Sequence, residues 1–111
     1  MPRAIVNIEP TTARDLHARG TVVLLDVRED SEWEAGHVSG AVHVPLSQLV
    51  PDRFAGADVV AICRSGNRSG KAAQILADAG VSVRNVNGGM RAWEDLGLPT
   101  ITPSGQPGTV V

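Results

Sequence analysis

Short apolar runs alternate with amphipathic stretches along most of this chain. The runs are rich in Val, Ile, Leu and Ala and occupy residues 5–8, 22–25, 41–44, 59–62 and 81–86. Most of them are continuous rather than alternating, which is typical of strands buried on both faces. Because helix signals separate them, the pattern predicts an α/β fold around a five-stranded, mainly parallel sheet.

Capping signals predict the first two helices. Thr12 and Asp15 have the spacing of a capping box for a helix that ends at Gly20. Ser31 and Glu34 repeat this spacing shortly before a glycine, so the second helix must be very short.

Apolar periodicity predicts the last two helices. The third begins near Arg68 and ends before residue 80, and we expect its apolar stripe to face the sheet. The residues of that stripe recur at i, i+3, i+4 and i+7: Ala72, Ile75, Leu76 and Ala79. The fourth, at about residues 89–96, places Met90 and Trp93 on one face, and Pro99 follows its end. We expect both of these side chains, and Trp33, to lie in the core.

The chain of 111 residues is the size of one domain with one core. We assign residues 1–99 to this domain. Residues 100–111 are rich in turn-forming residues and show no periodicity, so we expect an irregular tail that runs over the surface.

Charge and composition argue against several classes of partner. The formal net charge is −2, and no run of Lys or Arg offers a site for nucleic acid or an anionic membrane. No segment approaches the roughly 20 apolar residues that cross a bilayer. The single cysteine rules out an internal disulfide and fits a reducing compartment. We therefore expect a soluble, cytoplasmic protein.

That cysteine, Cys63, stands where parallel α/β sheets bind ligands. It follows the apolar run 59–62, at the predicted carboxyl end of a strand. The loop between it and the third helix reads Arg64, Ser65, Gly66, Asn67 and Arg68. Such a loop can turn its backbone N–H groups inward ahead of a helix N-terminus, forming an anion cradle that lowers a thiol pKa. The alternative is that Cys63 packs as a small buried hydrophobe.

The segment from Cys63 to Arg68 resembles the active-site loop of rhodaneses, in which a cysteine takes up a sulfane sulfur. Further family signatures are similar in order over about residues 22–99: Leu25 to Glu29, Glu32-Trp33, Gly36 to Val38, Gly40-Ala41, Val44-Pro45, Gly88-Gly89 and Ala92-Trp93. The resemblance implies a three-layer α/β/α sandwich and a thiosulfate sulfurtransferase that works through a Cys63 persulfide. The Cys-x4-Arg spacing resembles the sulfurtransferases, whereas related phosphatases and arsenate reductases have Cys-x5-Arg.

The expected reaction is a double displacement without a cofactor. A small-molecule donor such as thiosulfate delivers sulfur to Cys63, and a thiol or protein acceptor removes it. The loop from Arg64 to Arg68 is expected to bind the donor, with Arg64 setting donor specificity. Asp26 and Arg28 are expected to support the site as an ion pair.

The sequence leaves one alternative function open and disfavours others. A catalytically idle rhodanese-like interaction module stays open, and a phosphatase or arsenate reductase is disfavoured by the loop length. His37 and His43 lack the spacing of a metal site, and His37 fits a structural role in a loop. The segment from Gly66 to Lys71 departs from a nucleotide P-loop, so ATP binding is rejected.

Overall fold

A computed structural model describes residues 4–111 and contains one five-stranded sheet. Its strands are β1 (Val6–Ile8), β2 (Val23–Asp26), β3 (Val42–His43), β4 (Asp58–Ile62) and β5 (Ser82–Val86). They lie in the order β1-β5-β4-β2-β3, and every neighbouring pair is parallel. The predicted α/β fold is therefore confirmed, and the described sheet is entirely parallel.

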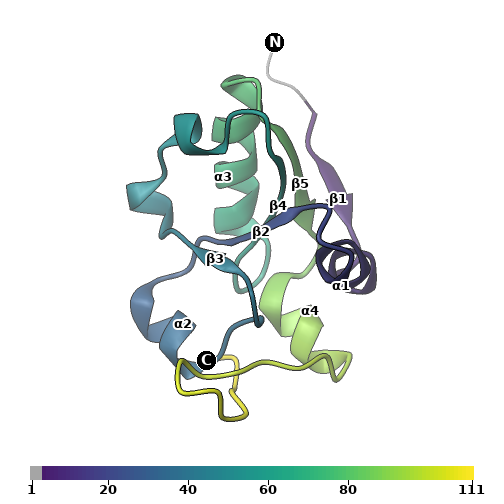
Figure 1. The fold of residues 1–111 in the computed structure, drawn as a ribbon, viewed down its shortest axis with the longest axis vertical. Helices are drawn as coiled ribbons and strands as arrows, with labels where there is room; N and C mark the ends of the chain where they lie inside the picture. The colour runs from purple at the N-terminus through teal and green to yellow at the C-terminus, as the bar shows by residue number, and fades with distance from the viewer. Residues whose placement is uncertain (1–3) are drawn as a thin grey trace.

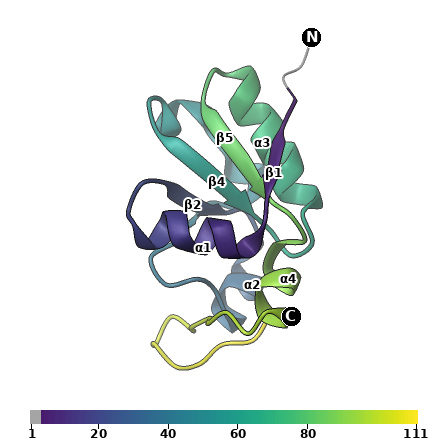
Figure 2. The same ribbon diagram turned by 90° about the vertical axis from the view of Figure 1, so that its right-hand side faces the viewer.

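Helices cover both faces of this sheet (Figures 1 and 2). The elements are α1 (Pro10–Ala18), α2 (Asp30–Ala35), α3 (Asn67–Asp78) and α4 (Gly89–Asp95), with 3₁₀ turns η1 (Leu46–Gln48) and η2 (Pro51–Phe54). Helix α3 and the two 3₁₀ turns pack on one face, and α1 and α4 pack on the other. None of the helices within residues 4–111 is long and apolar enough to cross a membrane.

Strand β4 divides its side chains between two apolar cores. Val59 belongs to the core under α3, whereas Val60 and Ile62 belong to the core under α1 and α4. Cys63 continues the alternation and falls on the α3 side. Because successive strand side chains point to opposite faces, this register aims the cysteine at the N-terminal end of α3.

The first two helices begin at different residues from those predicted. Helix α1 starts at Pro10, with Glu9 as the N-cap residue, rather than at Thr12. Proline at the first helical position has the φ angle that a helix needs and lacks the N–H that would lie unpaired there. In α2 the capping box joins Glu29 and Glu32 instead of Ser31 and Glu34.

The buried face of α3 is rotated from the predicted one. Ile75 is 43% exposed and Ala79 is also exposed, so these two positions do not face the sheet. The residues that do are Ser69, Ala72, Ala73, Leu76 and Ala77. Small alanines allow the helix to lie close to β4 and β5, and this close approach outweighs the burial of one isoleucine.

Trp33 is only half-buried, so its predicted place in the core is wrong, whereas Met90 and Trp93 are buried as predicted. The indole of Trp33 stacks on the rings of His37 and His43, with centroids 3.6 and 4.6 Å apart. His37 Nδ1–H donates to the Trp33 carbonyl at 2.9 Å, which confirms a structural role for this histidine.

Residues 100–111 contain no helix or named strand, yet they are tied to the domain. Ile101 forms isolated bridges with His37 and with Pro107. The Thr109 N–H donates to the Ala35 carbonyl at 2.9 Å. The segment therefore lies against the end of α2 (Figure 1), and the division of the chain at residue 99 stays a prediction.

We expect Gly36→Ala to destabilise the protein by about 1–3 kcal/mol, because an added Cβ would lie 2.5 Å from the Thr109 carbonyl oxygen. The backbone of Gly36 is extended, so the cost is steric rather than conformational. The measurement is the urea unfolding midpoint. The control is Gly70→Ala in the interior of α3, where the new Cβ meets nothing closer than 4.0 Å and stability should not fall. Equal stability of Gly36→Ala and the wild type would show that this contact does not persist in solution.

Candidate active site

The sulfur of Cys63 lies at the point where β4 passes into the loop before α3. The residue is 1% exposed. Its Sγ accepts hydrogen bonds from the Gly66 N–H at 3.1 Å and from the Ser69 hydroxyl at 3.3 Å. Gly66 has φ +106°, a left-handed conformation that glycine adopts without strain, and α3 begins at the next residue. The loop therefore closes around the sulfur.

The backbone of α4 sets the orientation of this loop. The Met90 N–H donates to the Cys63 carbonyl at 2.7 Å, and the Arg91 N–H donates to the Arg64 carbonyl at 3.0 Å. A trans peptide points its N–H away from its carbonyl. Fixing these two carbonyls toward α4 therefore turns the N–H groups of Arg64 and Ser65 in the opposite direction.

The approach of α4 to the loop requires glycine at position 89. A Cβ there would collide with the Cys63 carbonyl oxygen and would lie 2.7 Å from the carbonyl carbon of Arg64. Gly88 and Gly89 also have positive φ angles of 75° and 58°. The predicted close turn from the fifth strand into the last helix is thus present beside the cysteine.

Hydrogen bonding outweighs burial in setting the ionisation of Cys63. Burial raises the pKa of the thiol, but the Ser69 hydroxyl and the backbone N–H groups of Ser69, Gly66 and Ser65 lower it. The net result is a pKa below the usual value for cysteine. Fixed N–H dipoles stabilise the thiolate here, as they do at other anion cradles.

Arg68 is held by the carboxylate of Glu32, a residue that the sequence offered only as part of a family signature and not as a site residue. Its Nη1 and Nη2 donate to the two carboxylate oxygens of Glu32 at 2.6 and 2.8 Å. The hydrogen bonds from Arg68 lower the pKa of Glu32 to about 2, and those to Glu32 raise the pKa of Arg68. One edge of the Arg68 guanidinium is thus occupied by α2, and Glu32 joins the candidate site.

The other predicted loop residues have different surroundings. Ser65 and Gly66 contribute backbone N–H groups to the sulfur. Arg64 and Asn67 are exposed to solvent. Arg64 is therefore accessible to a donor in solution.

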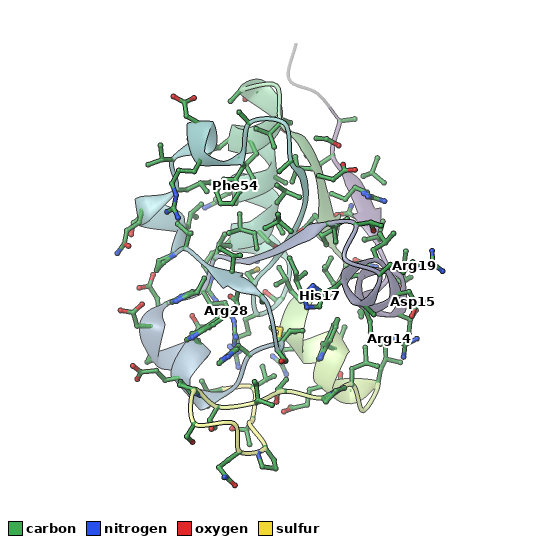
Figure 3. All side chains as sticks on the ribbon, in the orientation of Figure 1. Arg14, Asp15, His17, Arg19, Arg28 and Phe54 are labelled. Atoms are coloured by element: carbon green, nitrogen blue, oxygen red, sulfur yellow. The ribbon has the colours of Figure 1, made fainter. Side chains whose placement is uncertain are left out.

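Asp26 and Arg28 form a buried ion pair that supports α2. Arg28 donates through Nε and Nη2 to the Asp26 carboxylate, the shortest distance being 2.8 Å. The same Nη2 donates to the Gly36 carbonyl at 2.8 Å, so the guanidinium joins β2 to the end of α2 (Figure 3). Its Nη1 is the one buried side-chain nitrogen or oxygen of residues 4–111 without a hydrogen-bond partner. The pair thus positions the helix that carries Glu32.

A chain of hydrogen-bonded polar side chains lies behind Cys63, and the sequence patterns did not predict it. The Ser69 hydroxyl lies 2.5 Å from Asn85 Oδ1, and Asn85 Nδ2 donates to Asn7 Oδ1 at 3.0 Å. Asn7 and Asn85 are register partners in β1 and β5, which explains their contact. Val81 and Val83 alternate with Ser82 and Arg84, and Asn85 breaks this alternation by placing a polar residue at the next inward position, which is the signal that points to it.

Family comparison decides which class of domain carries this cysteine loop. A family model described as the rhodanese-like domain matches residues 9–96. The chain belongs to the rhodanese-like family. Within residues 4–111, no three His, Cys, Asp or Glu side chains gather as a metal site in this rhodanese-like domain.

Individual relatives support the assignment to the rhodanese-like family. The chain is 40% identical over 106 residues to an uncharacterized protein of Synechocystis, covering 92% of this chain and 59% of that relative. It is 34% identical over 110 residues to chloroplastic thiosulfate sulfurtransferase 16 of Arabidopsis thaliana, covering 85% of this chain and 91% of that protein. A rhodanese-related protein from Thermoplasma volcanium superposes with a TM-score of 0.74 at 26% identity, covering 86% of this chain and 97% of that one.

The ion pair between Glu32 and Arg68 predicts a pH-dependent contribution to stability. The pKa of Glu32 falls from 4.5 to about 2 on folding, so the contribution is complete above pH 4.5 and is lost as the pH falls through about 2. We expect Glu32→Gln to lower the free energy of unfolding by about 1 kcal/mol at pH 7, a figure reduced for partial exposure. Urea unfolding at a series of pH values measures it, with Glu34→Gln on the exposed side of α2 as control. If the difference in the free energy of unfolding between Glu32→Gln and the wild type persists unchanged at pH 2, the ion pair with Arg68 is not its source.

Proposed function

We propose that this rhodanese-like chain is a sulfurtransferase that carries a sulfane sulfur as a persulfide on Cys63. The observation that carries the proposal is the hydrogen bonding of Sγ by Gly66 and Ser69 at the end of β4. A thiolate is the form of cysteine that attacks sulfur, and the lowered pKa of Cys63 increases its share at neutral pH. Similarity to chloroplastic thiosulfate sulfurtransferase 16 of Arabidopsis thaliana supports the same chemistry.

In the first half-reaction the Cys63 thiolate attacks the outer sulfur of an anionic donor, for which we propose thiosulfate. The new bond joins Sγ to that sulfur, and the sulfur–sulfur bond of thiosulfate breaks with its electron pair going to sulfite. The persulfide keeps one negative charge on its outer sulfur. Backbone N–H groups of the loop are the donors that stabilise this anion.

In the second half-reaction a thiolate acceptor attacks the outer sulfur of the Cys63 persulfide. The bond between Sγ and the outer sulfur breaks, and its electron pair returns to Sγ as the thiolate. The donors that surround Sγ therefore favour departure of the cysteine. A small thiol or a partner protein is the proposed acceptor.

Two rival functions fit the site less well. A phosphatase or arsenate reductase binds a tetrahedral oxyanion, and the loop from Cys63 to Arg68 has only four intervening residues. Two nitrogen donors of Arg68 are also bound to Glu32 and so do not face an oxyanion in the loop. An idle interaction module has no use for a cysteine whose pKa is lowered by directed hydrogen bonds.

The proposal predicts that wild-type protein gains the mass of one sulfur atom after incubation with thiosulfate, whereas Cys63→Ser does not. The readout is intact-protein mass spectrometry, followed by release of thiocyanate when cyanide is added. Uptake of sulfur by both proteins, or by neither, would overturn the proposal. In the second case the interaction module becomes the better reading.

Arg64→Ala is expected to reduce kcat/KM for thiosulfate about fivefold, because an exposed charge contributes about 1 kcal/mol to the approach of a dianion. Persulfide formation from a neutral donor should change much less. Arg53→Ala, which removes an equal charge from the 3₁₀ turn η2, serves as the control. Equal losses with the charged and the neutral donor would show that Arg64 does not select the donor.

A further inference from the structure

The Ser69 hydroxyl faces two acceptors with a single hydrogen. Its Oγ lies 2.5 Å from Asn85 Oδ1 and 3.3 Å from Cys63 Sγ. Ser69 is fully buried and Asn85 nearly so. Because a hydroxyl carries one hydrogen, Ser69 donates fully to only one of the two groups at a time.

The orientation of the Asn85 amide is fixed by its other contacts. Nδ2 donates to Asn7 Oδ1 at 3.0 Å and reaches the Gly66 carbonyl at 3.4 Å. Oδ1 must therefore face Ser69, and an amide oxygen can only accept. Asn85 thus competes with the sulfur for the hydrogen of Ser69.

The outcome of this competition depends on the charge of Sγ. A neutral thiol, or the bridging sulfur of a persulfide, is a weak acceptor, so the hydrogen lies toward Asn85. A thiolate is an ionised acceptor and binds a donor more strongly. The hydroxyl is therefore expected to rotate toward Sγ as the negative charge returns to it.

We propose that Asn85 is a positioning residue that holds the Ser69 hydroxyl away from Sγ while Cys63 is neutral or loaded with sulfur and releases it when Cys63 becomes a thiolate. Ser69 is then a catalytic residue, since it touches the sulfur that leaves in the second half-reaction. This role in transfer rests on the proposed sulfurtransferase function. The competition between Asn85 and Sγ for the Ser69 hydrogen does not depend on sulfur transfer, because it exists in the protein without bound sulfur.

Opposite effects of two substitutions follow. Ser69→Ala removes a donor from the thiolate, so the pKa of Cys63 should rise and discharge of the persulfide should slow about tenfold. Asn85→Leu keeps the volume of the side chain but removes the competing acceptor. Ser69 then donates to Sγ permanently, so the pKa of Cys63 should fall and discharge should not slow.

The charged groups near Cys63 are the same in the wild type, in Ser69→Ala and in Asn85→Leu. Arg68 on α3 interacts with the thiolate and is paired with Glu32 on α2. Arg64 and Arg91 carry exposed side chains beside the loop. A change in the pKa of Cys63 between variants therefore reports the hydroxyl rather than a change in charge.

The experiment measures the alkylation rate of Cys63 against pH, together with single-turnover transfer of sulfur from the loaded protein to cyanide. Asn87→Leu is the matched control for Asn85→Leu, since Asn87 is exposed and lies outside the buried chain. Ser82→Ala, at an exposed serine of β5, is the control for Ser69→Ala. The proposal expects a raised pKa for Ser69→Ala, a lowered pKa for Asn85→Leu and no shift in either control.

A shift of the Cys63 pKa in the same direction for Ser69→Ala and Asn85→Leu would overturn the proposal, because general loosening of the loop acts alike in both. If Asn85→Leu does not fold, Asn7→Ala replaces it. Removing the exposed Asn7 frees the amide of Asn85 to turn its Nδ2 toward Ser69, which should also lower the pKa. Wild-type protein that takes up no sulfur would overturn the proposed function, while the alkylation arm still decides the competition for the hydrogen.

Discussion

Two backbone hydrogen bonds from α4 to the loop after β4 shape the whole candidate site. They hold the carbonyls of Cys63 and Arg64 and so turn the following N–H groups the other way. These bonds exist only because β4 and β5 are neighbours and because Gly89 lets the two backbones approach. The order of strands in the parallel sheet thus determines the geometry at Cys63, because it places α4, which follows β5, beside the loop that follows β4.

The balance of charge around Cys63 explains why dipoles matter more than cations here. Arg28 is neutralised by Asp26 inside the protein, and Arg68 is neutralised by Glu32 at the rim. The directed donors of Gly66 and Ser69 therefore carry most of the stabilisation of the thiolate. Such donors act on the cysteine at short range and leave attraction of a distant anion to the exposed Arg64.

The C-terminal segment contributes to the same site indirectly. It runs past the end of α2 (Figure 2). There the Thr109 N–H donates to the Ala35 carbonyl, and Gly36 meets the backbone of residues 108–109. Arg28 holds the other side of Gly36 through its carbonyl. Helix α2, only six residues long, is therefore braced from two directions while it presents Glu32 to Arg68.

The sequence by itself determined the positions of the strands, the approximate positions of the helices and the place of Cys63, because apolar runs, helical periodicity and glycines act locally. It also located the loop residues and the close turn at Gly88 and Gly89. It did not give the capping residues of the first two helices. The tertiary structure decided which donors reach the sulfur. Ser69 looked like any polar residue of a helix start, and Glu32 lies 36 residues from Arg68 along the chain. Partners so distant meet only when the strands are ordered side by side, and local patterns contain no record of that order.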